Sequence, residues 1–239
     1  MLESMNRREM AAYRPGQVAA WLNLPTATVR AWAMGQHYDL RGRRRFFKPV
    51  IEPTRLGVPR NAPLALSFVN FVEVHVLSAL RRVHAIPLPK IRRSIEYLAD
   101  RYPGVQHPLA DLDLLTDGLD VWLEELGRLV AVSRHGQMGI KEVLEAHLRR
   151  VDRGPRGQAL RLYPFPRPGD VATQPRSIVV DPEVAFGRPT LAGTGIVTRV
   201  IAGRFDAGES LESLVEDFAR PADDILEAIR WELREQRAA

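Results

Sequence analysis

Apolar residues near the N-terminus recur at helical spacing and predict two short helices. In the first, Val18, Trp21 and Leu22 share one face. Pro15 stands near the first helical position, where its missing backbone N–H leaves no hydrogen bond unmade. Residues 23–25, which end in a proline, interrupt the pattern and separate this helix from the next.

The second helix is expected over residues 27–34. Thr26 is placed to cap its N-terminus, Val29 and Trp32 lie on its inner face, and Gly35 supplies a C-terminal stop. Two short helices joined by about three residues have the spacing of a helix-turn-helix. The residues expected to face outward from the second helix are Thr26, Thr28, Arg30 and Ala31.

A basic segment follows these two helices directly. It reads Arg41-Gly42-Arg43-Arg44-Arg45-Phe46-Phe47-Lys48, with five cations in eight residues and a glycine among them. This pattern is typical of a wing hairpin whose tip lies over a phosphate backbone. The residues that we expect to bind DNA are therefore Thr26, Thr28, Arg30, Arg41, Arg43, Arg44, Arg45 and Lys48.

The central region predicts a second helix pair followed by a small β-hairpin. Apolar residues recur at intervals of three and four over residues 66–80 and again over 87–98. Residues 119–133 change period and favour two short strands about a glycine-containing turn. A further helix is expected over residues 140–151. Residues 61–151 would then form an α+β platform for domain or dimer packing.

A stretch rich in proline, glycine and arginine follows the central region. Proline lacks a backbone donor and restricts φ, so this composition disfavours a continuous helix or a central strand. We expect residues 152–176 to form an extended linker.

The C-terminal residues 177–239 predict a short strand and three helices. Residues 178–180 favour the strand, and the first helix is expected to end near Gly208. Ser210 is placed to cap the second helix, and Pro221 opens the third. The fold class expected is mainly α with small β elements: an N-terminal winged helix-turn-helix, a central α+β platform and a C-terminal three-helix, helix-turn-helix-like domain.

Charge is distributed unevenly along the chain. The total of 34 Lys or Arg against 29 Asp or Glu gives a net charge of only +5. Residues 1–60 carry 11 Lys or Arg against four Asp or Glu, a net of +7, whereas residues 171–239 carry eight against 12, a net of −4. We expect the acidic part to repel phosphate. The residues expected to form that acidic surface are Asp223, Asp224, Glu227 and Glu232.

The composition also excludes several kinds of site. Cysteine is absent, which excludes disulfides, thiolate metal sites and thiol catalysis. There is neither an apolar stretch of 18 residues nor a signal-peptide pattern, so we expect a cytoplasmic protein without membrane contact. His75 and His84 lack a second ligand at zinc spacing. With no catalytic pair or metal-ligand cluster recognisable, we expect neither an enzyme nor a cofactor.

Three stretches of the head carry a family resemblance. They are Tyr13-Arg14-Pro15-Gly16-Gln17-Val18-Ala19, Thr28-Val29-Arg30-Ala31-Trp32 and Arg43-Arg44-Arg45-Phe46. With these stretches, residues 1–60 resemble the MerR-type winged helix-turn-helix, which implies a DNA-binding head. The long dimerising helix and effector domain of that type are not evident, so effector sensing is not implied.

The C-terminal part carries a second and more specific motif. Its matching residues are Asp181-Pro182, Gly187-Arg188-Pro189, Gly193-Thr194, Ile196, Gly208-Glu209-Ser210 and Asp223-Asp224-Ile225. In these residues it resembles the small helix-turn-helix domain of VapB-type antitoxins, which are encoded beside PIN-domain toxins. Gly195 stands where that family usually has arginine, so the resemblance does not imply the role of that arginine for this protein.

The two modules in this order resemble the VapB antitoxin of a mycobacterial VapBC pair. The resemblance implies a type II antitoxin that binds its own operator DNA, autoregulates its operon and neutralises a PIN-domain ribonuclease toxin by direct binding, as a homodimer or a higher toxin–antitoxin assembly. A stand-alone MerR-like transcriptional regulator with a dimerising tail remains an alternative.

The resemblance also implies contacts with the toxin. In such pairs an antitoxin cation is commonly inserted among the carboxylates of the toxin's metal site, where it would compensate their charge. The sequence is compatible with two groups of candidate toxin-binding residues, one in the linker and one in the last helix. The candidates are Arg156, Arg161, Tyr163, Phe165 and Arg167 in the linker, and Arg230 and Arg234 in the helix.

Overall fold

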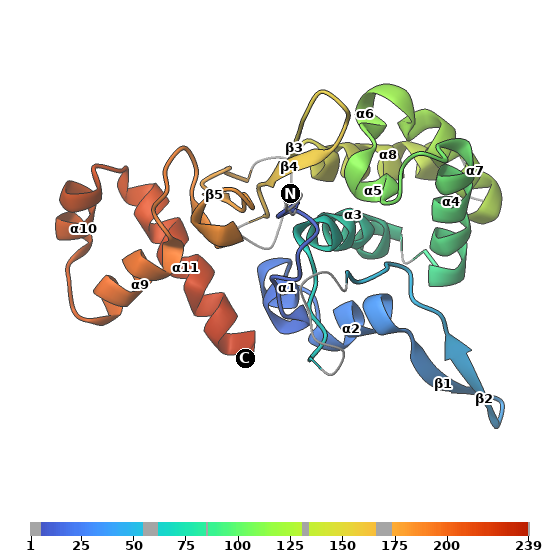
Figure 1. The fold of residues 1–239 in the computed structure, drawn as a ribbon, viewed down its shortest axis with the longest axis horizontal. Helices are drawn as coiled ribbons and strands as arrows, with labels where there is room; N and C mark the ends of the chain where they lie inside the picture. Colours follow the sequence, from blue (N-terminus) through green and yellow to red (C-terminus); the bar gives the residue numbers. More distant parts are fainter. Residues whose placement is uncertain (1–5, 55–61, 85, 131–133, 166–173, 239) are drawn as a thin grey trace, which may run out of the picture.

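The computed structural model describes residues 6–54, 62–84, 86–130, 134–165 and 174–238. These residues are mostly helical and include three pairs of short antiparallel strands, which confirms the expected fold class. Figure 1 shows a helical centre, from which a β-hairpin projects on one side and a C-terminal unit extends on the other.

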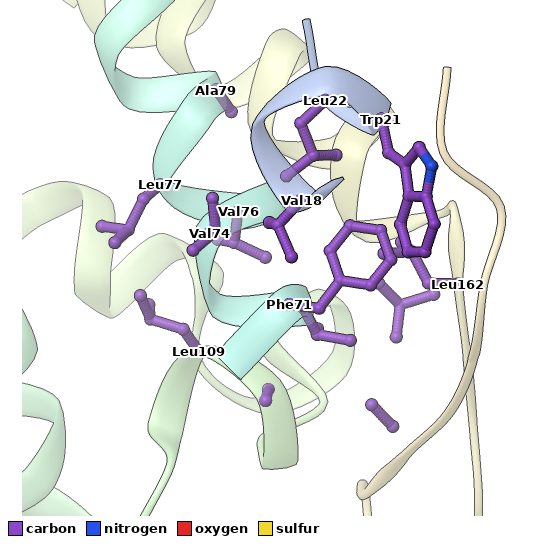
Figure 2. Close-up of a cluster of buried hydrophobic side chains, with 14 of the residues drawn as sticks. Val18, Trp21, Leu22, Phe71, Val74, Val76, Leu77, Ala79, Leu109 and Leu162 are labelled. Carbon is purple, nitrogen blue, oxygen red and sulfur yellow. The ribbon is translucent and has the colours of Figure 1, made fainter. Parts of the chain in front are cut away.

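A helix-turn-helix opens the chain, as the sequence predicts. It consists of α1 (Pro15–Trp21) and α2 (Thr26–Met34). Val18, Val29 and Trp32 are buried between these helices and the rest of the core. Figure 2 shows Val18 and Trp21 of α1, and Leu22 directly after it, beside Phe71, in a cluster that anchors the helix-turn-helix.

Two local expectations for α2 were wrong. The residue that caps α2 is Pro25, and Thr26 is the first residue of the helix. Ala31 is buried and does not face outward. The predicted stop is confirmed, since Gly35 ends α2 with a φ of 73°.

The basic segment forms the expected hairpin. Strands β1 (Gln36–Leu40) and β2 (Arg43–Phe47) pair antiparallel, with Leu40 opposite Arg43. The turn therefore has two central residues, Arg41 and Gly42, and both have a positive φ, of 53° and 74°. A two-residue turn of this kind has a twist that matches paired strands, so the hairpin is regular up to its tip.

The centre contains the predicted second helix pair. It is formed by α3 (Phe68–His84) and α4 (Leu88–Arg101). Helix α3 is the main core element, because its apolar residues are buried on several faces at once. Two short helices follow, α5 (Pro108–Asp111) and α6 (Leu114–Asp117).

The β-hairpin expected over residues 119–133 was wrong. Residues Leu119–Val130 form a helix, α7, and residues 131–133 lie outside the described part. Leu119, Trp122 and Leu126, at spacings of three and four, are buried on one face of α7. The glycine expected in a turn lies inside the helix. The following helix, α8 (Arg134–Leu148), begins earlier than the helix expected over residues 140–151 and overlaps most of it.

The linker expected over residues 152–176 was also wrong in its first part. Strands β3 (Val151–Arg153) and β4 (Ala159–Leu162) pair antiparallel and belong to the fold. The Gly- and Pro-rich residues between them form the turn of this hairpin, in which Gly157 has a φ of 80°. Residues 166–173 lie outside the described part.

The C-terminal module, residues 177–238, contains the predicted strand and three helices. Strands β5 (Ile178–Val179) and β6 (Thr190–Leu191) flank a short 3₁₀ helix, η1 (Ala185–Gly187). The helices are α9 (Thr198–Asp206), α10 (Leu211–Phe218) and α11 (Ala222–Ala238). As predicted, Ser210 caps α10, and its side chain accepts a hydrogen bond from the Ser213 N–H at 3.2 Å.

Helix α11 packs against α1, so the C-terminal module is docked on the head (Figure 1). The Trp21 and Trp231 rings lie 6.1 Å apart between centroids. The Tyr13 hydroxyl donates a buried hydrogen bond to the Gly187 carbonyl at 3.0 Å. The two modules therefore share a core.

The acidic surface expected on the last helix is mostly absent. Glu227 and Glu232 are buried, the former paired with Arg230 at 2.8 Å and the latter accepting a hydrogen bond from the Thr198 hydroxyl. Asp224 pairs with an arginine one turn away, and of the four acidic residues only Asp223 is exposed. These carboxylates stabilise the module internally and do not form a continuous negative face.

Candidate nucleic-acid interface

The exposed face of α2 is the first part of the candidate interface. Arg30 is exposed, and Thr26, four residues before it, is half-buried on the same face of the helix. Thr28 is also half-buried, but at a spacing of two residues it lies on another face. Val29 and Trp32 fix the opposite face in the core. A helix held in this way can enter a major groove with the guanidinium of Arg30 and the hydroxyl of Thr26 toward the bases.

The wing supplies the second part. Arg41, Arg43, Arg44 and Arg45 are exposed, and none has an ion pair with another residue that the structure describes. Successive side chains alternate across a strand, so Arg43 and Arg45 share one face of the hairpin. Arg44 lies opposite Asp39 in the strand register. The side chains of Arg43 and Arg45 thus have no carboxylate opposite them in the hairpin.

The base of the wing is held by α4, through a residue that the sequence did not single out. Arg92 donates a hydrogen bond to the Pro49 carbonyl at 3.2 Å and another to the Lys48 carbonyl. Its guanidinium also lies 4.8 Å from the centroid of the Phe47 ring. The Lys48 side chain itself is exposed. Arg92 therefore holds the base of the wing, through contacts that only the tertiary structure shows.

The wing is also joined to α2. The backbone N–H groups of Val50 and Ile51 both donate to the Trp32 carbonyl, at 2.7 and 3.1 Å. At Gly35, a Cβ would lie 2.3 Å from the Phe47 carbonyl oxygen, so only glycine fits there. These contacts hold the wing and α2 as one rigid surface.

The candidate toxin-binding residues in and near the β3–β4 hairpin differ in their burial and in their partners. Arg161 is paired with Asp181 at 2.7 Å, and Phe165 is buried. Tyr163 lies under the guanidinium of Arg176, 3.8 Å from its ring centroid. Arg156 is exposed in the hairpin turn and has no ion pair with another described residue. Arg167 lies outside the described residues.

The two candidates in α11 already have partners within the module. Arg230 is the partner of Glu227, and the guanidinium of Arg234 lies 5.3 Å from the centroid of the Trp231 ring. Burial lowers the pKa of Arg234. Both side chains would have to exchange an internal contact for one with a toxin.

The residues of the C-terminal motif build turns. Asp181 is buried and accepts a hydrogen bond from the Glu183 N–H at 2.9 Å, which closes the turn at Pro182. Gly187 has a φ of 74°, and a Cβ there would lie 2.3 Å from the Tyr13 hydroxyl. The motif thus shapes the contact between the modules.

The second half of the motif orders the entry to α9. The Pro189 carbonyl accepts the Thr198 N–H at 3.0 Å. The Thr194 hydroxyl donates to the Leu191 carbonyl at 2.8 Å. Gly193, the residue before Thr194, has a φ of 74°. Arg188 is exposed. Gly195, where the resembling family usually has arginine, is exposed with open space around it.

Neither a metal centre nor a membrane span is found among the described residues. These residues contain no group of three or more His, Asp or Glu side chains arranged to hold a metal ion. Their helices include none with the length and apolar character that crossing a bilayer requires.

Comparisons with known proteins agree with this arrangement. Residues 11–95 match the family described as "Putative DNA-binding HTH domain", and residues 178–231 match "Protein of unknown function (DUF433)". The crystal structure of Rv2018 from Mycobacterium tuberculosis is similar, with a TM-score of 0.68 and 25% identity, over 92% of this chain and 98% of that one.

Two curated proteins of Mycobacterium tuberculosis are similar along nearly their whole length. "Putative antitoxin VapB45" is 28% identical over 93% of this chain and 94% of its own. "Uncharacterized protein Rv2308" is 28% identical over 95% and 92%, respectively. The chain thus has a helix-turn-helix head followed by a segment similar to DUF433, and it resembles a putative VapB-type antitoxin over almost its entire length.

Proposed function

We propose that this protein is a type II antitoxin that binds its operator DNA through the head and a PIN-domain ribonuclease toxin through the rest of the chain. The observation that carries the DNA-binding part is the wing, whose four arginines are exposed without ion pairs to other described residues. The similarity to a putative antitoxin over 93% of the chain supports the toxin-binding part.

In this proposal, α2 and the wing have separate tasks. Thr26 and Arg30 face base edges in the major groove, where an arginine binds guanine with two parallel hydrogen bonds, and Thr28 contacts the DNA from the neighbouring side of the helix. The wing cations contact phosphates, which fixes the register of the protein on the duplex without reading the sequence. Binding of a homodimer to a two-fold symmetric operator would repress the antitoxin's own operon.

Salt dependence tests the wing. Replacing Arg43 and Arg45 with alanine should lower the slope of log affinity against log salt by about two units, roughly one for each phosphate that the variant no longer binds. The measurement is a fluorescence titration of DNA from upstream of the gene at several salt concentrations. The matched control is Arg188→Ala, which removes an exposed arginine of the C-terminal module. An unchanged slope in the wing variant would exclude phosphate binding by the wing.

For toxin binding, Arg156 is the candidate that the structure favours. Its guanidinium is exposed at a hairpin turn, whereas Arg161 and Arg230 already have carboxylate partners. A projecting arginine can enter a cluster of carboxylates, compensate their charge and take the place of the metal ion. Arg156→Ala should therefore restore ribonuclease activity in the complex more than Arg161→Ala does.

Co-expression separates the antitoxin from a stand-alone regulator. The protein is produced together with the product of the neighbouring gene, and the complex is examined by affinity purification and by relief of growth arrest. A stable complex and relieved arrest are expected. If no complex forms and growth arrest persists, the protein is a regulator whose C-terminal module serves only dimerisation.

A further inference from the structure

A cleft of about 740 Å³ lies where the head meets the C-terminal module. Its lining comes from the start of α1, from one face of α2 and from α9. The charged residues among those that line it are all arginines, namely Arg14, Arg30 and Arg199. Three arginines from three separate segments therefore line one concave surface.

The cleft is continuous with the face of α2 that we propose to read DNA. Thr26, Arg30 and Met34 line one side of it. These residues are four apart, so they form a single stripe along the helix. Arg30 thus belongs both to the recognition face and to the cleft.

The arginines of the cleft have no ion pairs with described residues, unlike a nearby arginine of the C-terminal module. Arg14, Arg30 and Arg199 are exposed, and none has an ion pair with another described residue. Arg204, about one and a half turns further along α9 than Arg199, is bound by Glu209 at 2.7 Å and by Asp217 at 2.5 Å. Helix α9 thus has one arginine that stabilises the module and one that is free to bind an anion.

The position of Arg199 relative to the head is fixed by buried contacts. Thr198, its neighbour, donates its backbone N–H to the Pro189 carbonyl at 3.0 Å and its hydroxyl to Glu232 of α11. Helix α11 is in turn packed on α1 through Trp231 and Trp21. The Arg199 side chain is therefore carried by a helix that buried contacts hold beside the recognition face.

We propose that this cleft binds the phosphate backbone of the DNA duplex beside the groove that α2 enters, so that DNA contacts both modules. The proposal rests on the DNA-binding function proposed above. Phosphate fits the site because an arginine can give one phosphate group two parallel hydrogen bonds, and because the described lining has no carboxylate to repel it. The C-terminal module, although its net charge is −5, thereby adds a cation to the DNA interface.

The test compares two exposed arginines of the C-terminal module. Arg199→Gln should lower the slope of log affinity against log salt by about one unit, whereas Arg188→Gln should leave it unchanged because Arg188 does not line the cleft. Arg199→Lys retains the charge and should retain most of the slope. The probe is a duplex from upstream of the gene, with a duplex of scrambled sequence in parallel. Thermal melts check that every variant is folded.

The outcomes separate this inference from the proposed function. If the wing variant has a reduced slope and Arg199→Gln does not, the wing binds DNA and the cleft does not, which overturns the inference alone. If the wild-type protein binds neither duplex, both proposals fail. Hydroxyl-radical footprints add a second readout: Arg199→Gln should abolish protection at phosphates flanking the α2 site and retain it at the site itself.

Discussion

Replacing Trp231 with alanine measures how strongly the C-terminal module is attached to the head. The indole is 1% exposed and lies 6.1 Å from that of Trp21 between ring centroids. Truncating a buried tryptophan to alanine costs about 3–5 kcal/mol of unfolding free energy. In a chain of this size each kcal/mol corresponds to about 2–4 °C, so Tm should fall by about 6–20 °C.

A double-mutant cycle with Trp21 isolates the contact between the modules. Aromatic pairs with centroids about 4.5–7 Å apart contribute about 0.5–1.5 kcal/mol beyond the area that they bury. The summed destabilisation of Trp21→Ala and Trp231→Ala should therefore exceed that of the double variant by at least this amount. Urea unfolding, followed by near-ultraviolet circular dichroism, gives the three values.

Trp122→Ala is the matched control. Trp122 is fully buried in α7, at the far side of the molecule from α11 (Figure 1). Its destabilisation should combine additively with that of Trp231→Ala, within about 0.5 kcal/mol. If Trp21 and Trp231 were equally additive, the two indoles would not stabilise each other and the docked arrangement of the modules would be refuted.

Three further substitutions test single interactions. Tyr13→Phe leaves the buried Gly187 carbonyl without its 3.0 Å hydrogen bond and should cost about 1–3 kcal/mol in urea unfolding. Burial lowers the pKa of His107, but its hydrogen bond and the charge of Glu73 outweigh this and raise the pKa above 6.5. The resulting stability is present below pH 6.5 and disappears as pH rises through the raised pKa, and His107→Gln should remove this pH dependence of unfolding. Ser210→Ala removes the cap of α10 and should cost about 1 kcal/mol, measured by thermal unfolding.

Elements with a clear local signal were predictable from the sequence. The wing is an example: Gly42 permits the positive φ that its turn requires, and cations on both sides are exposed as expected. Ser210 is predictable as a cap because a short hydroxyl side chain can bind the first free N–H groups of a helix. Such signals lie within a few residues of chain, so no tertiary information is needed to find them.

Where one local signal had two interpretations, the sequence was insufficient. Gly127 suggested a turn, but it is buried inside α7, where the packing of Trp122 and Leu126 outweighs the roughly 1 kcal/mol cost of a helical glycine. Gly154 and Pro155 suggested a linker, although the same residue types also form hairpin turns. The carboxylate of Glu227 is expected at the surface but is buried. The sequence shows its partner Arg230 three residues later, but it does not show that the carboxylate is buried.

The docking of the C-terminal module could not be inferred from local patterns at all. Tyr13 and Gly187 are far apart in the chain, and nothing near either residue indicates the other. The same holds for Arg14 and Arg199, which the fold brings to one cleft. Functional residues that depend on such contacts require the three-dimensional structure.

The packing of α11 on α1 also has a consequence for the order in which the protein matures. Trp21 is synthesised about 210 residues before the indole that covers it, which belongs to residue 231. Until α11 is made, part of the apolar surface of α1 faces solvent. The same holds for a chain from which proteolysis has removed α11. Completion of the head therefore waits until α11 has been translated, and a protease that removes this helix from the finished protein would expose the same surface.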